Sequence, residues 1–190
     1  MPLRILGGKA KGQLLKSPPE NSITRPTSVM LKRKFFDAFQ DLGEAHFYDL
    51  CAGSGSVGIE AWSRGVKQVE LVEKDPKAVK VIKENIQVLA QKNLDFRKEV
   101  QLKIFDVKQY LSLTALDKEG VYFFDPPYEN TKLYEAVLSL ALDPLQDFKL
   151  FVVEFCHQKT MSEAEFQQRY GEPLKSYHHS THHLYVYSRV

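Results

Sequence analysis

The stretch Asp49-Leu50-Cys51-Ala52-Gly53-Ser54-Gly55-Ser56-Val57-Gly58 decides the fold that this chain is expected to adopt. The apolar residues 47–50 predict a buried strand, and residues 59–62 predict the opening of a helix. Between them, three glycines have the spacing G-x-G-x-x-G. A strand, a glycine-rich turn and a helix in this order are typical of a nucleotide-cofactor site.

Two acidic residues help to distinguish the possible cofactors. Asp49 lies at the carboxyl end of the first strand, where a carboxylate would repel the pyrophosphate of NAD. The same carboxylate suits S-adenosylmethionine, which carries an ammonium and a sulfonium group and no phosphate. Glu73 ends the next strand, at a spacing where an acid accepts hydrogen bonds from the ribose of either cofactor. S-adenosylmethionine is therefore predicted, with a plain βαβ turn and two surface acids as the structural alternative.

Composition and length set the broad class of the protein. A chain of 190 residues that is 43% hydrophobic is expected to form one domain with a full core. No apolar run is long enough to span a bilayer, and residues 1–4 lack the core of a signal peptide. Two cysteines are too few for a disulfide framework or a structural zinc site. We therefore expect a cytoplasmic monomer without a metal ion or a membrane contact.

Positive charge is concentrated at the start of the chain. The first 34 residues carry a net charge of +7 and the remainder −5. This asymmetry predicts a nucleic-acid-binding end, and a solvated charged face is the plainer alternative. A short strand at 3–6, turns at Gly7-Gly8 and Lys11-Gly12 and the returning Leu14-Leu15 predict a hairpin. Residues 1–24 are assigned to this basic arm and residues 25–190 to the main domain.

Helices and strands alternate along the rest of the chain. Helices are predicted from Thr27 or Ser28 to Gly43, over 76–91, 107–113 and 131–142, and from Ser162 to about Arg169. Further strands are predicted at 100–105, 121–124, 150–155, 173–178 and 183–188. The last two strands are joined too tightly for a crossover helix and should pair antiparallel. The pattern predicts an α/β fold with a doubly wound, mostly parallel seven-stranded sheet and an antiparallel edge.

Asp125-Pro126-Pro127-Tyr128 directly follows the predicted strand 121–124. In a doubly wound sheet this position lies beside the glycine turn. The prolines fix the backbone and leave carbonyl groups without competing N–H donors. Asp125 and the Pro126 carbonyl can then accept both hydrogens of an exocyclic amine and direct its lone pair at a methyl donor. Tyr128 offers a ring on which a base can stack, and a proline turn with an aromatic plug is the structural alternative.

The motifs resemble class I S-adenosylmethionine-dependent methyltransferases that act on amines. The order of four segments is similar, more specifically, to the RsmD-type family of bacterial 16S ribosomal RNA guanine-N2 methyltransferases. These segments are residues 4–12, Arg25-Pro26-Thr27-Ser28, residues 49–65 and the D-P-P-Y motif. The basic hairpin with R-P-T-S is the most specific part. Val29-Met30 and Lys32-Arg33 depart from the Asp-Arg and Arg-Glu pairs usual in that family.

The resemblance implies a role for each of a set of residues. It implies that the target guanine is held by Asp125, Pro126, Pro127 and Tyr128. It implies cofactor contacts from Asp49, Ala52, Gly53, Ser54, Gly55, Gly58, Glu73, Lys74, Asp106 and Val107, with Asp106 on the adenine amino group. The expected RNA contacts are Arg4, Lys9, Lys11, Arg25 and Thr27. The implied substrate is 16S ribosomal RNA or the small-subunit particle.

Other functions stay open at this point. DNA adenine-N6, DNA cytosine-N4 and protein glutamine methyltransferases share D-P-P-Y or close variants, although this chain has no separate target-recognition domain. A non-catalytic RNA-binding protein is disfavoured by the intact motifs, and an NAD oxidoreductase by Asp49.

Several reactive side chains are expected to have no catalytic role. Cys51 is predicted to pack under the cofactor, and not to attack a pyrimidine carbon, because it precedes the first glycine. Cys156 and Trp62 are predicted core residues. The cluster of His178, His179, His182 and His183 lacks a supporting acid or thiolate cluster, so exposed histidines that touch RNA are favoured over metal ligands.

Overall fold

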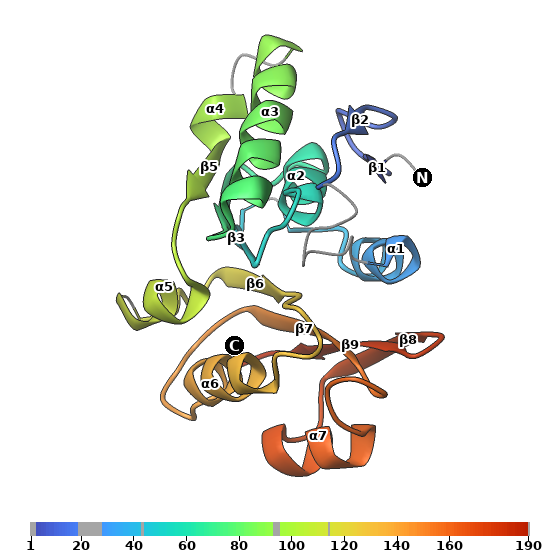
Figure 1. The fold of residues 1–190 in the computed structure, drawn as a ribbon, viewed down its shortest axis with the longest axis vertical. Helices are drawn as coiled ribbons and strands as arrows, with labels where there is room; N and C mark the ends of the chain where they lie inside the picture. The colour runs from blue at the N-terminus through green and yellow to red at the C-terminus, as the bar shows by residue number, and fades with distance from the viewer. Residues whose placement is uncertain (1–2, 19–27, 43, 93–95, 114, 190) are drawn as a thin grey trace.

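The computed structural model describes residues 3–18, 28–42, 44–92, 96–113 and 115–189. Within these ranges one seven-stranded sheet has the order β5-β4-β3-β6-β7-β9-β8 (Figure 1). The strands are β3 (His46–Leu50), β4 (Gln68–Val72), β5 (Val100–Lys103), β6 (Gly120–Phe124), β7 (Leu150–Cys156), β8 (Lys175–His179) and β9 (His182–Tyr187). Strands β3 to β7 pair in parallel, and β9 is antiparallel to both β7 and β8. The predicted fold class is confirmed.

Helices cover both faces of the sheet, as Figure 1 shows. On one face lie α1 (Val29–Ala38), α2 (Ser56–Ser63), α3 (Pro76–Lys92) and α4 (Phe96–Glu99). On the other lie α5 (Val107–Leu113), α6 (Thr131–Ala141) and α7 (Glu163–Tyr170). Each layer has its own apolar cluster, and the sheet separates the two clusters. Trp62 and Cys156 are buried as predicted.

The chain order within the sheet determines where a ligand can bind. From β3 the chain proceeds outward through β4 and β5, and it then returns to place β6 on the other side of β3. The connections therefore diverge between β3 and β6, and this leaves a crevice beyond their carboxyl ends. The glycine turn follows β3 and the D-P-P-Y motif follows β6, so both motifs lie at this switch point.

Some element boundaries differ from those predicted. Helix α1 ends at Ala38 because Phe39 leaves the helical conformation, and Gly43 lies outside the described residues. Helix α2 begins at Ser56, immediately after Gly55 with its φ of 77°, so Gly58 lies inside the helix. Strand β5 ends two residues early, at Lys103. The short helix α4 was not predicted, because four residues are too few to show a helical period.

The predicted N-terminal hairpin consists of β1 (Leu3–Arg4) and β2 (Leu14–Leu15). Leu3, Ile5 and Leu15 are buried in the same apolar cluster as α1 and α2. Ser63 at the end of α2 fastens the loop of the hairpin: its hydroxyl donates to the Gly7 carbonyl at 2.6 Å and accepts the Ala10 N–H at 2.9 Å. The hairpin therefore packs firmly on the main body, while the division at residue 24 stays a prediction.

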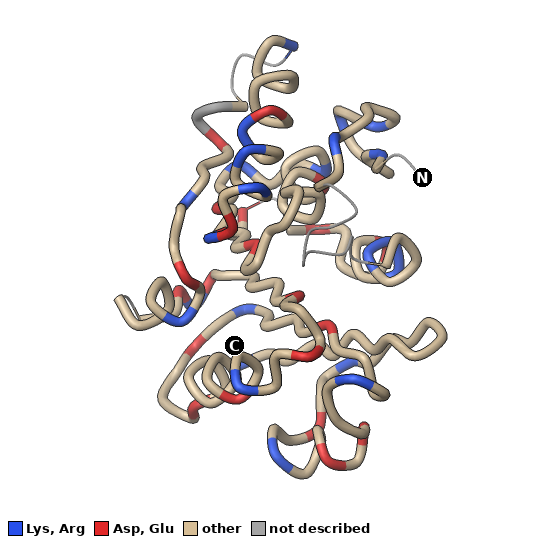
Figure 2. Tube along the Cα trace, in the orientation of Figure 1, with Lys and Arg blue, Asp and Glu red and all other residues tan. Residues whose placement is uncertain are grey.

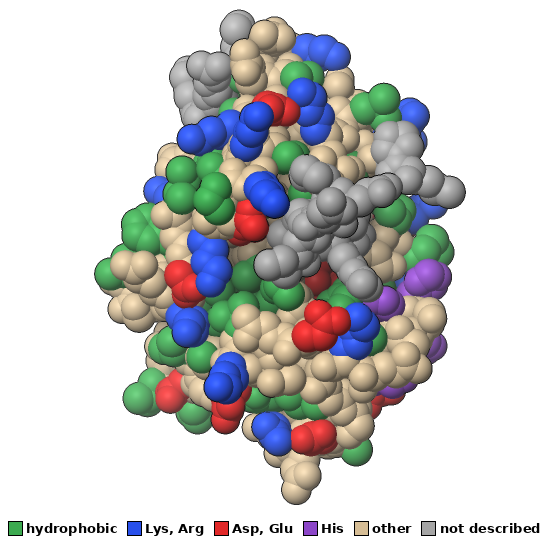
Figure 3. Space-filling view, in the orientation of Figure 1, with side chains coloured by type: hydrophobic (Ala, Val, Ile, Leu, Met, Phe, Trp, Pro, Cys, Tyr) green, Lys and Arg blue, Asp and Glu red, His purple; other side chains and the backbone are tan. Residues whose placement is uncertain are grey.

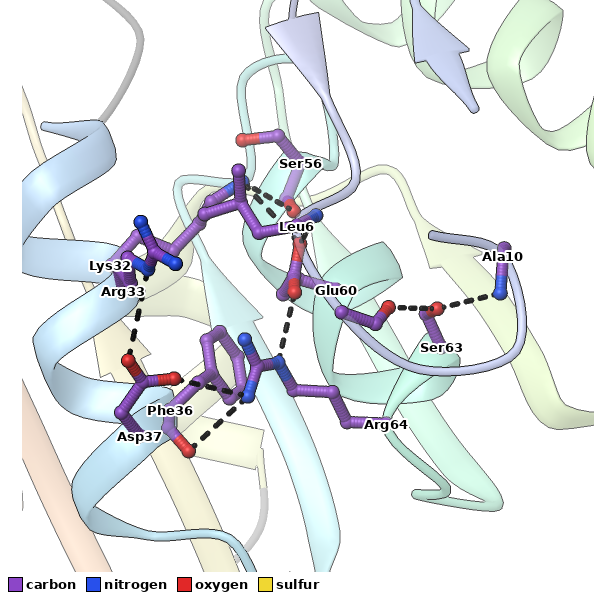
Figure 4. Close-up of polar contacts among 11 residues, drawn as sticks. Leu6, Ala10, Lys32, Arg33, Phe36, Asp37, Ser56, Glu60, Ser63 and Arg64 are labelled. Atoms are coloured by element: carbon purple, nitrogen blue, oxygen red, sulfur yellow. Dashed lines mark hydrogen bonds and ion pairs between the residues drawn. The ribbon is translucent and has the colours of Figure 1, made fainter. Parts of the chain in front are cut away.

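A cluster of charged side chains, with Glu60 at its centre, joins the hairpin to α1 and α2 (Figure 4). Glu60 is fully buried and accepts the Leu6 N–H at 2.7 Å and Arg64 Nε at 2.8 Å. Lys32 Nζ lies 3.9 Å from the Glu60 carboxylate and donates to the Ser56 carbonyl at 3.4 Å. Burial lowers the pKa of Lys32, against the opposing effect of Glu60. Lys32 contributes to the positive charge of the first 34 residues, but it is part of the interior and not of the surface.

The loop of the hairpin contains a glycine that other residues should not replace. Gly8 has a φ of 75°, and a Cβ there would lie 1.8 Å from the Ser63 carbonyl oxygen. Gly12 has a similar φ of 87° but open space around its Cα. Gly12→Ala should therefore cost only the left-handed backbone strain, about 1–2 kcal/mol of unfolding free energy.

Gly8→Ala adds a collision with backbone to the same strain, so it should cost more than Gly12→Ala and detach the hairpin from α2. Urea unfolding of both variants, with limited proteolysis of the hairpin, measures the difference. Equal losses of stability in the two variants would contradict the close packing of Gly8 against the Ser63 carbonyl.

Candidate active site

One cleft at the carboxyl edge of the sheet brings the two predicted motifs together. It is lined by Pro18, Asp49, Cys51, Ala52, Gly53, Ser54, Ser56, Val72, Glu73, Lys74, Asp75, Phe105, Val107, Asp125, Pro126, Pro127, Tyr128, Glu129, Asn130, Leu133 and Lys159. A hollow with hydrophobic side chains on its floor is visible in the middle of the face in Figure 3. Most of the predicted cofactor and target residues therefore share one cleft, whereas Gly55, Gly58 and Asp106 are not among its lining residues.

Asp49 lies deeper than the sequence suggested. Its carboxyl group is 2% exposed, and its Oδ2 accepts the N–H of Gly58 at 2.8 Å. Burial raises the pKa of Asp49 to about 8, although the Gly58 N–H and Lys32 act in the opposite direction. Burial at this position therefore disfavours the charged form of the carboxyl group. The argument that a charged Asp49 would repel the pyrophosphate of NAD is therefore weaker in the folded chain. The exclusion of NAD stays a prediction.

Glu73 organises the backbone around the glycine turn. Its Oε2 accepts the Gly53 N–H at 2.8 Å, and its Oε1 accepts the N–H groups of Lys74 and Asp75, each at 2.8 Å. Gly53 and Gly55 both have positive φ, which the absence of a side chain permits. Each carboxylate oxygen has two acceptor sites, so Glu73 can still accept a ribose hydroxyl while it holds the turn.

An ion pair joins the segments that follow β4 and β5. Lys74 Nζ lies 2.7 Å from Asp106 Oδ2, and Asp106 Oδ1 accepts the Lys108 N–H at 2.9 Å. Burial alone would raise the pKa of Asp106, but these donors outweigh it and hold the pKa below its usual value. Asp106 is therefore a charged acceptor next to Val107 and Phe105, which line the cleft.

Cys51 lies in the cleft wall with a φ of 62°, in the left-handed region. Burial, followed by the charges of Glu73 and Asp125, raises the pKa of its thiol well above the usual value. A neutral thiol is a poor nucleophile. This agrees with the interpretation that Cys51 packs in the site and forms no covalent bond to a base.

The D-P-P-Y motif is supported by residues that the sequence analysis missed. Tyr128 is only 9% exposed, and its hydroxyl donates to Glu154 Oε1 at 2.8 Å. His182 Nδ1 lies 3.0 Å from the same hydroxyl oxygen. Burial raises the pKa of Tyr128, with further contributions from Asp125 and Glu154. The sequence contains one sign of this support, which is the acid Glu154 within the otherwise apolar run 150–156.

Of the predicted RNA-binding residues, Arg4, Lys9 and Lys11 lie on the hairpin, away from the residues that line the cleft. Figure 2 shows basic positions along the hairpin and α1. Lys9 makes contacts within the protein: its Nζ lies 3.1 Å from Glu99 Oε2, as an ion pair, and 4.2 Å from the centroid of the Trp62 ring. Arg4 donates to the Gly12 carbonyl at 3.3 Å, and Lys11 is exposed. Arg25 and Thr27 lie outside the described residues.

The histidines of the last hairpin differ from one another, although all four were expected to be exposed. His178 and His179 are exposed, whereas His183 is buried against Phe155 and shares a hydrogen bond of 3.0 Å with His157. The expectation of exposure was wrong for His183 because β9 is the strand next to β7. Among the described residues no group of three metal-ligating side chains could hold an ion, and no helix could cross a membrane.

The family model described as "Conserved hypothetical protein 95" matches residues 3–185 of this chain. The chain belongs to this family. A relative from Bacillus subtilis, named "Putative rRNA methyltransferase YlbH", is 36% identical over 143 residues, which is 73% of each chain. "Ribosomal RNA small subunit methyltransferase D" of Haemophilus influenzae is 32% identical and covers 73% of this chain and 69% of its own. The resemblance to RsmD-type proteins is confirmed.

Solved structures in the comparison have the same fold. A hypothetical protein of Thermus thermophilus is 28% identical and has a TM-score of 0.71. The match covers 98% of this chain and 99% of that protein. The N-terminal hairpin is thus included in the shared architecture together with the seven-stranded sheet.

Proposed function

We propose that this chain is an S-adenosylmethionine-dependent methyltransferase of ribosomal RNA that modifies the exocyclic N2 amine of a guanine in 16S RNA. The observation that carries the proposal is the shared cleft, which is lined by both the glycine turn after β3 and the D-P-P-Y motif after β6. The names of the relatives, which are ribosomal RNA methyltransferases, support the class of substrate.

The residues around the glycine turn fit S-adenosylmethionine. Glu73 offers its remaining acceptor site to a ribose hydroxyl, and Asp106 offers a charged acceptor to an amino group. Val72, Phe105 and Val107 supply an apolar wall for an adenine ring. Bound there, the cofactor would supply an electrophilic methyl group on its sulfonium and leave as S-adenosylhomocysteine.

The D-P-P-Y residues hold the amine. The carboxylate of Asp125 and the carbonyl of Pro126 accept its two hydrogens and orient the nitrogen lone pair. S-adenosylmethionine would supply the methyl group that this nitrogen accepts, and the amine would release one proton to solvent after the transfer. A guanine inside a duplex cannot reach this cleft, so an unpaired or flipped nucleotide is the expected target.

The product of the reaction tests the function. Labelled methyl from S-adenosylmethionine is traced into ribosomal RNA of a strain that lacks the enzyme, followed by nuclease digestion and chromatography. Label in N2-methylguanine of small-subunit RNA is the expected outcome. Label in N6-methyladenine of DNA, in a carbon-methylated pyrimidine or in protein glutamine would overturn the proposal. Calorimetry should detect binding of S-adenosylmethionine and S-adenosylhomocysteine, and tight binding of NAD instead would overturn the cofactor assignment.

Lys11, an exposed lysine in the loop of the hairpin, should contribute to RNA affinity. Lys11→Glu should weaken RNA binding and reduce the salt dependence by about one phosphate contact, because each such contact releases counterions. Cofactor affinity should not change. Lys118→Glu is the matched control, because Lys118 is exposed but lies before β6, at the opposite end of that strand from the cleft.

Filter binding at several salt concentrations compares the two lysine variants. Equal affinities and equal salt slopes for Lys11→Glu and Lys118→Glu would remove the hairpin from the RNA interface.

A further inference from the structure

Glu154 occupies a place in β7 where an apolar residue would be expected. Its neighbours in the run 150–156 are all buried, and Glu154 itself is 0% exposed. The last paired residues of β6 and β7 are Phe124 and Val153, so Asp125 and Glu154 follow them at the same edge of the sheet. A buried carboxylate therefore lies at the carboxyl edge of β7, beside the strand whose end carries the D-P-P-Y motif.

The contacts of Glu154 point to Tyr128. Its Oε1 accepts the Tyr128 hydroxyl at 2.8 Å, and His182 Nδ1 lies 3.7 Å from the same oxygen. The one hydroxyl hydrogen of Tyr128 is used on Glu154, so His182 Nδ1 reaches that hydroxyl, 3.0 Å away, as a donor. The two rings meet edge to face with centroids 5.1 Å apart. The phenol is thus held between β7 and β9.

The backbone of Tyr128 is held from the same side. Thr160, in the loop after β7, donates from its hydroxyl to the Tyr128 carbonyl at 3.0 Å. The hydroxyl of Tyr134 on α6 donates to the backbone carbonyl of Glu154 at 2.8 Å and secures β7 against that helix. Tyr128 is therefore fixed at both ends, although one edge of it still lines the cleft.

The second oxygen of Glu154 has a feature that packing does not explain. Oε2 is buried and has no hydrogen-bond partner among the described residues. Burial of a carboxylate with a free oxygen is costly, and an apolar side chain of similar volume is often at least as stable in such a place. Stability alone gives no reason for an acid at this position, whereas the hydrogen bond to Tyr128 does.

We propose that Glu154 is a positioning residue for methyl transfer, which holds the Tyr128 ring through its hydroxyl so that the target base is seated against Asp125. The inference rests on the proposed function and adds a residue to it. It also assigns a role to the Tyr128 hydroxyl, because removal of that group releases the ring from Glu154 and His182.

Three variants separate positioning from mere packing. Glu154→Leu removes the acceptor and fills the space, Glu154→Gln keeps a neutral acceptor, and Tyr128→Phe removes the donor. Single-turnover methylation at saturating RNA and cofactor should slow about tenfold or more in Glu154→Leu, since misplacement by about 1 Å can cost a hundredfold. Glu154→Gln should lose less. The unfolding midpoint of Glu154→Leu should stay near that of the wild type, because removal of a buried carboxylate offsets the loss of an acceptor for the Tyr128 hydroxyl. Its affinity for S-adenosylmethionine should not change.

A double variant tests whether Glu154 acts through Tyr128. Tyr128→Phe/Glu154→Leu should be no slower than Tyr128→Phe alone, because the hydrogen bond is already lost. Glu163→Gln is the matched control: this acid contacts Tyr185 and His183 in the same region but makes no contact with Tyr128, and its rate should equal that of the wild type. Additive losses in the double variant, or a wild-type rate in Glu154→Leu, would overturn the inference.

A measurement without RNA keeps this inference separate from the proposed function. The proton NMR signal of the Tyr128 hydroxyl, assigned by its loss in Tyr128→Phe, should be visible in the wild type and should disappear in Glu154→Leu. A hydroxyl signal that persists in Glu154→Leu would show that Glu154 does not hold the ring. If this signal behaves as expected while the wild type leaves ribosomal RNA unmethylated, the proposed function fails and the anchoring of Tyr128 stands.

Discussion

Asp125→Ala should abolish methyl transfer while the binding of S-adenosylmethionine persists. Asp125 follows β6 and lines the part of the cleft that is proposed to hold the target base. The hydrogen bonds to Gly53 and Gly58 come instead from Glu73 and Asp49. Loss of one preorganised polar contact to a reacting group costs on the order of a hundredfold to a thousandfold in rate. Asp125→Asn keeps one acceptor oxygen without the charge and should retain more activity than Asp125→Ala.

Single-turnover kinetics and calorimetry of the same preparations measure the two effects of Asp125→Ala. Glu119→Ala is the matched control, because Glu119 is an exposed acid just before β6, at the end of the strand remote from the cleft. An Asp125→Ala enzyme with the wild-type rate would defeat the mechanism. Loss of cofactor binding in that variant would instead move Asp125 into the cofactor site.

Glu73→Ala should have the opposite pattern, with loss of cofactor binding as the primary defect. The carboxylate holds the N–H groups of Gly53, Lys74 and Asp75 and is proposed to accept the ribose hydroxyls. Hydrogen bonds to a charged group are worth about 1.5–3 kcal/mol each, so the dissociation constant for S-adenosylmethionine should rise about a hundredfold. Unfolding free energy should also fall, because three N–H groups lose their acceptor.

Calorimetry with S-adenosylmethionine and S-adenosylhomocysteine tests Glu73→Ala, and thermal unfolding shows whether the chain still folds. Glu73→Gln distinguishes the effect on the glycine turn from the effect on cofactor binding. Its amide oxygen can still accept hydrogen bonds from the N–H groups of the turn, while the negative charge is lost. Glu84→Ala is the control, because Glu84 is an acid on α3 that pairs with Lys16 and is not among the residues that line the cleft. Unchanged affinity in a folded Glu73→Ala variant would remove this residue from the cofactor site.

The sequence was sufficient for the architecture, because the architecture depends on short-range patterns. The apolar runs that became β3, β6 and β7 and the spaced glycines between 53 and 58 are local features. Parallel strands joined by helices must bring their carboxyl ends to one edge. The position of the glycine turn and of Asp125-Pro126-Pro127-Tyr128 at one edge therefore follows from these local patterns, and the pairing of β3 with β6 brings them into one cleft.

Only the tertiary structure decided the environments of single side chains, because these depend on residues distant in the chain. Lys32 is buried because Glu60 and the Ser56 carbonyl lie against it, although its local pattern indicated a basic surface. Burial raises the pKa of Asp49 to about 8, an effect of the surrounding elements that its position in the sequence does not show. Glu154 and His182 meet the Tyr128 hydroxyl because β7 and β9 are adjacent in the sheet, and a sequence pattern contains no information on that contact.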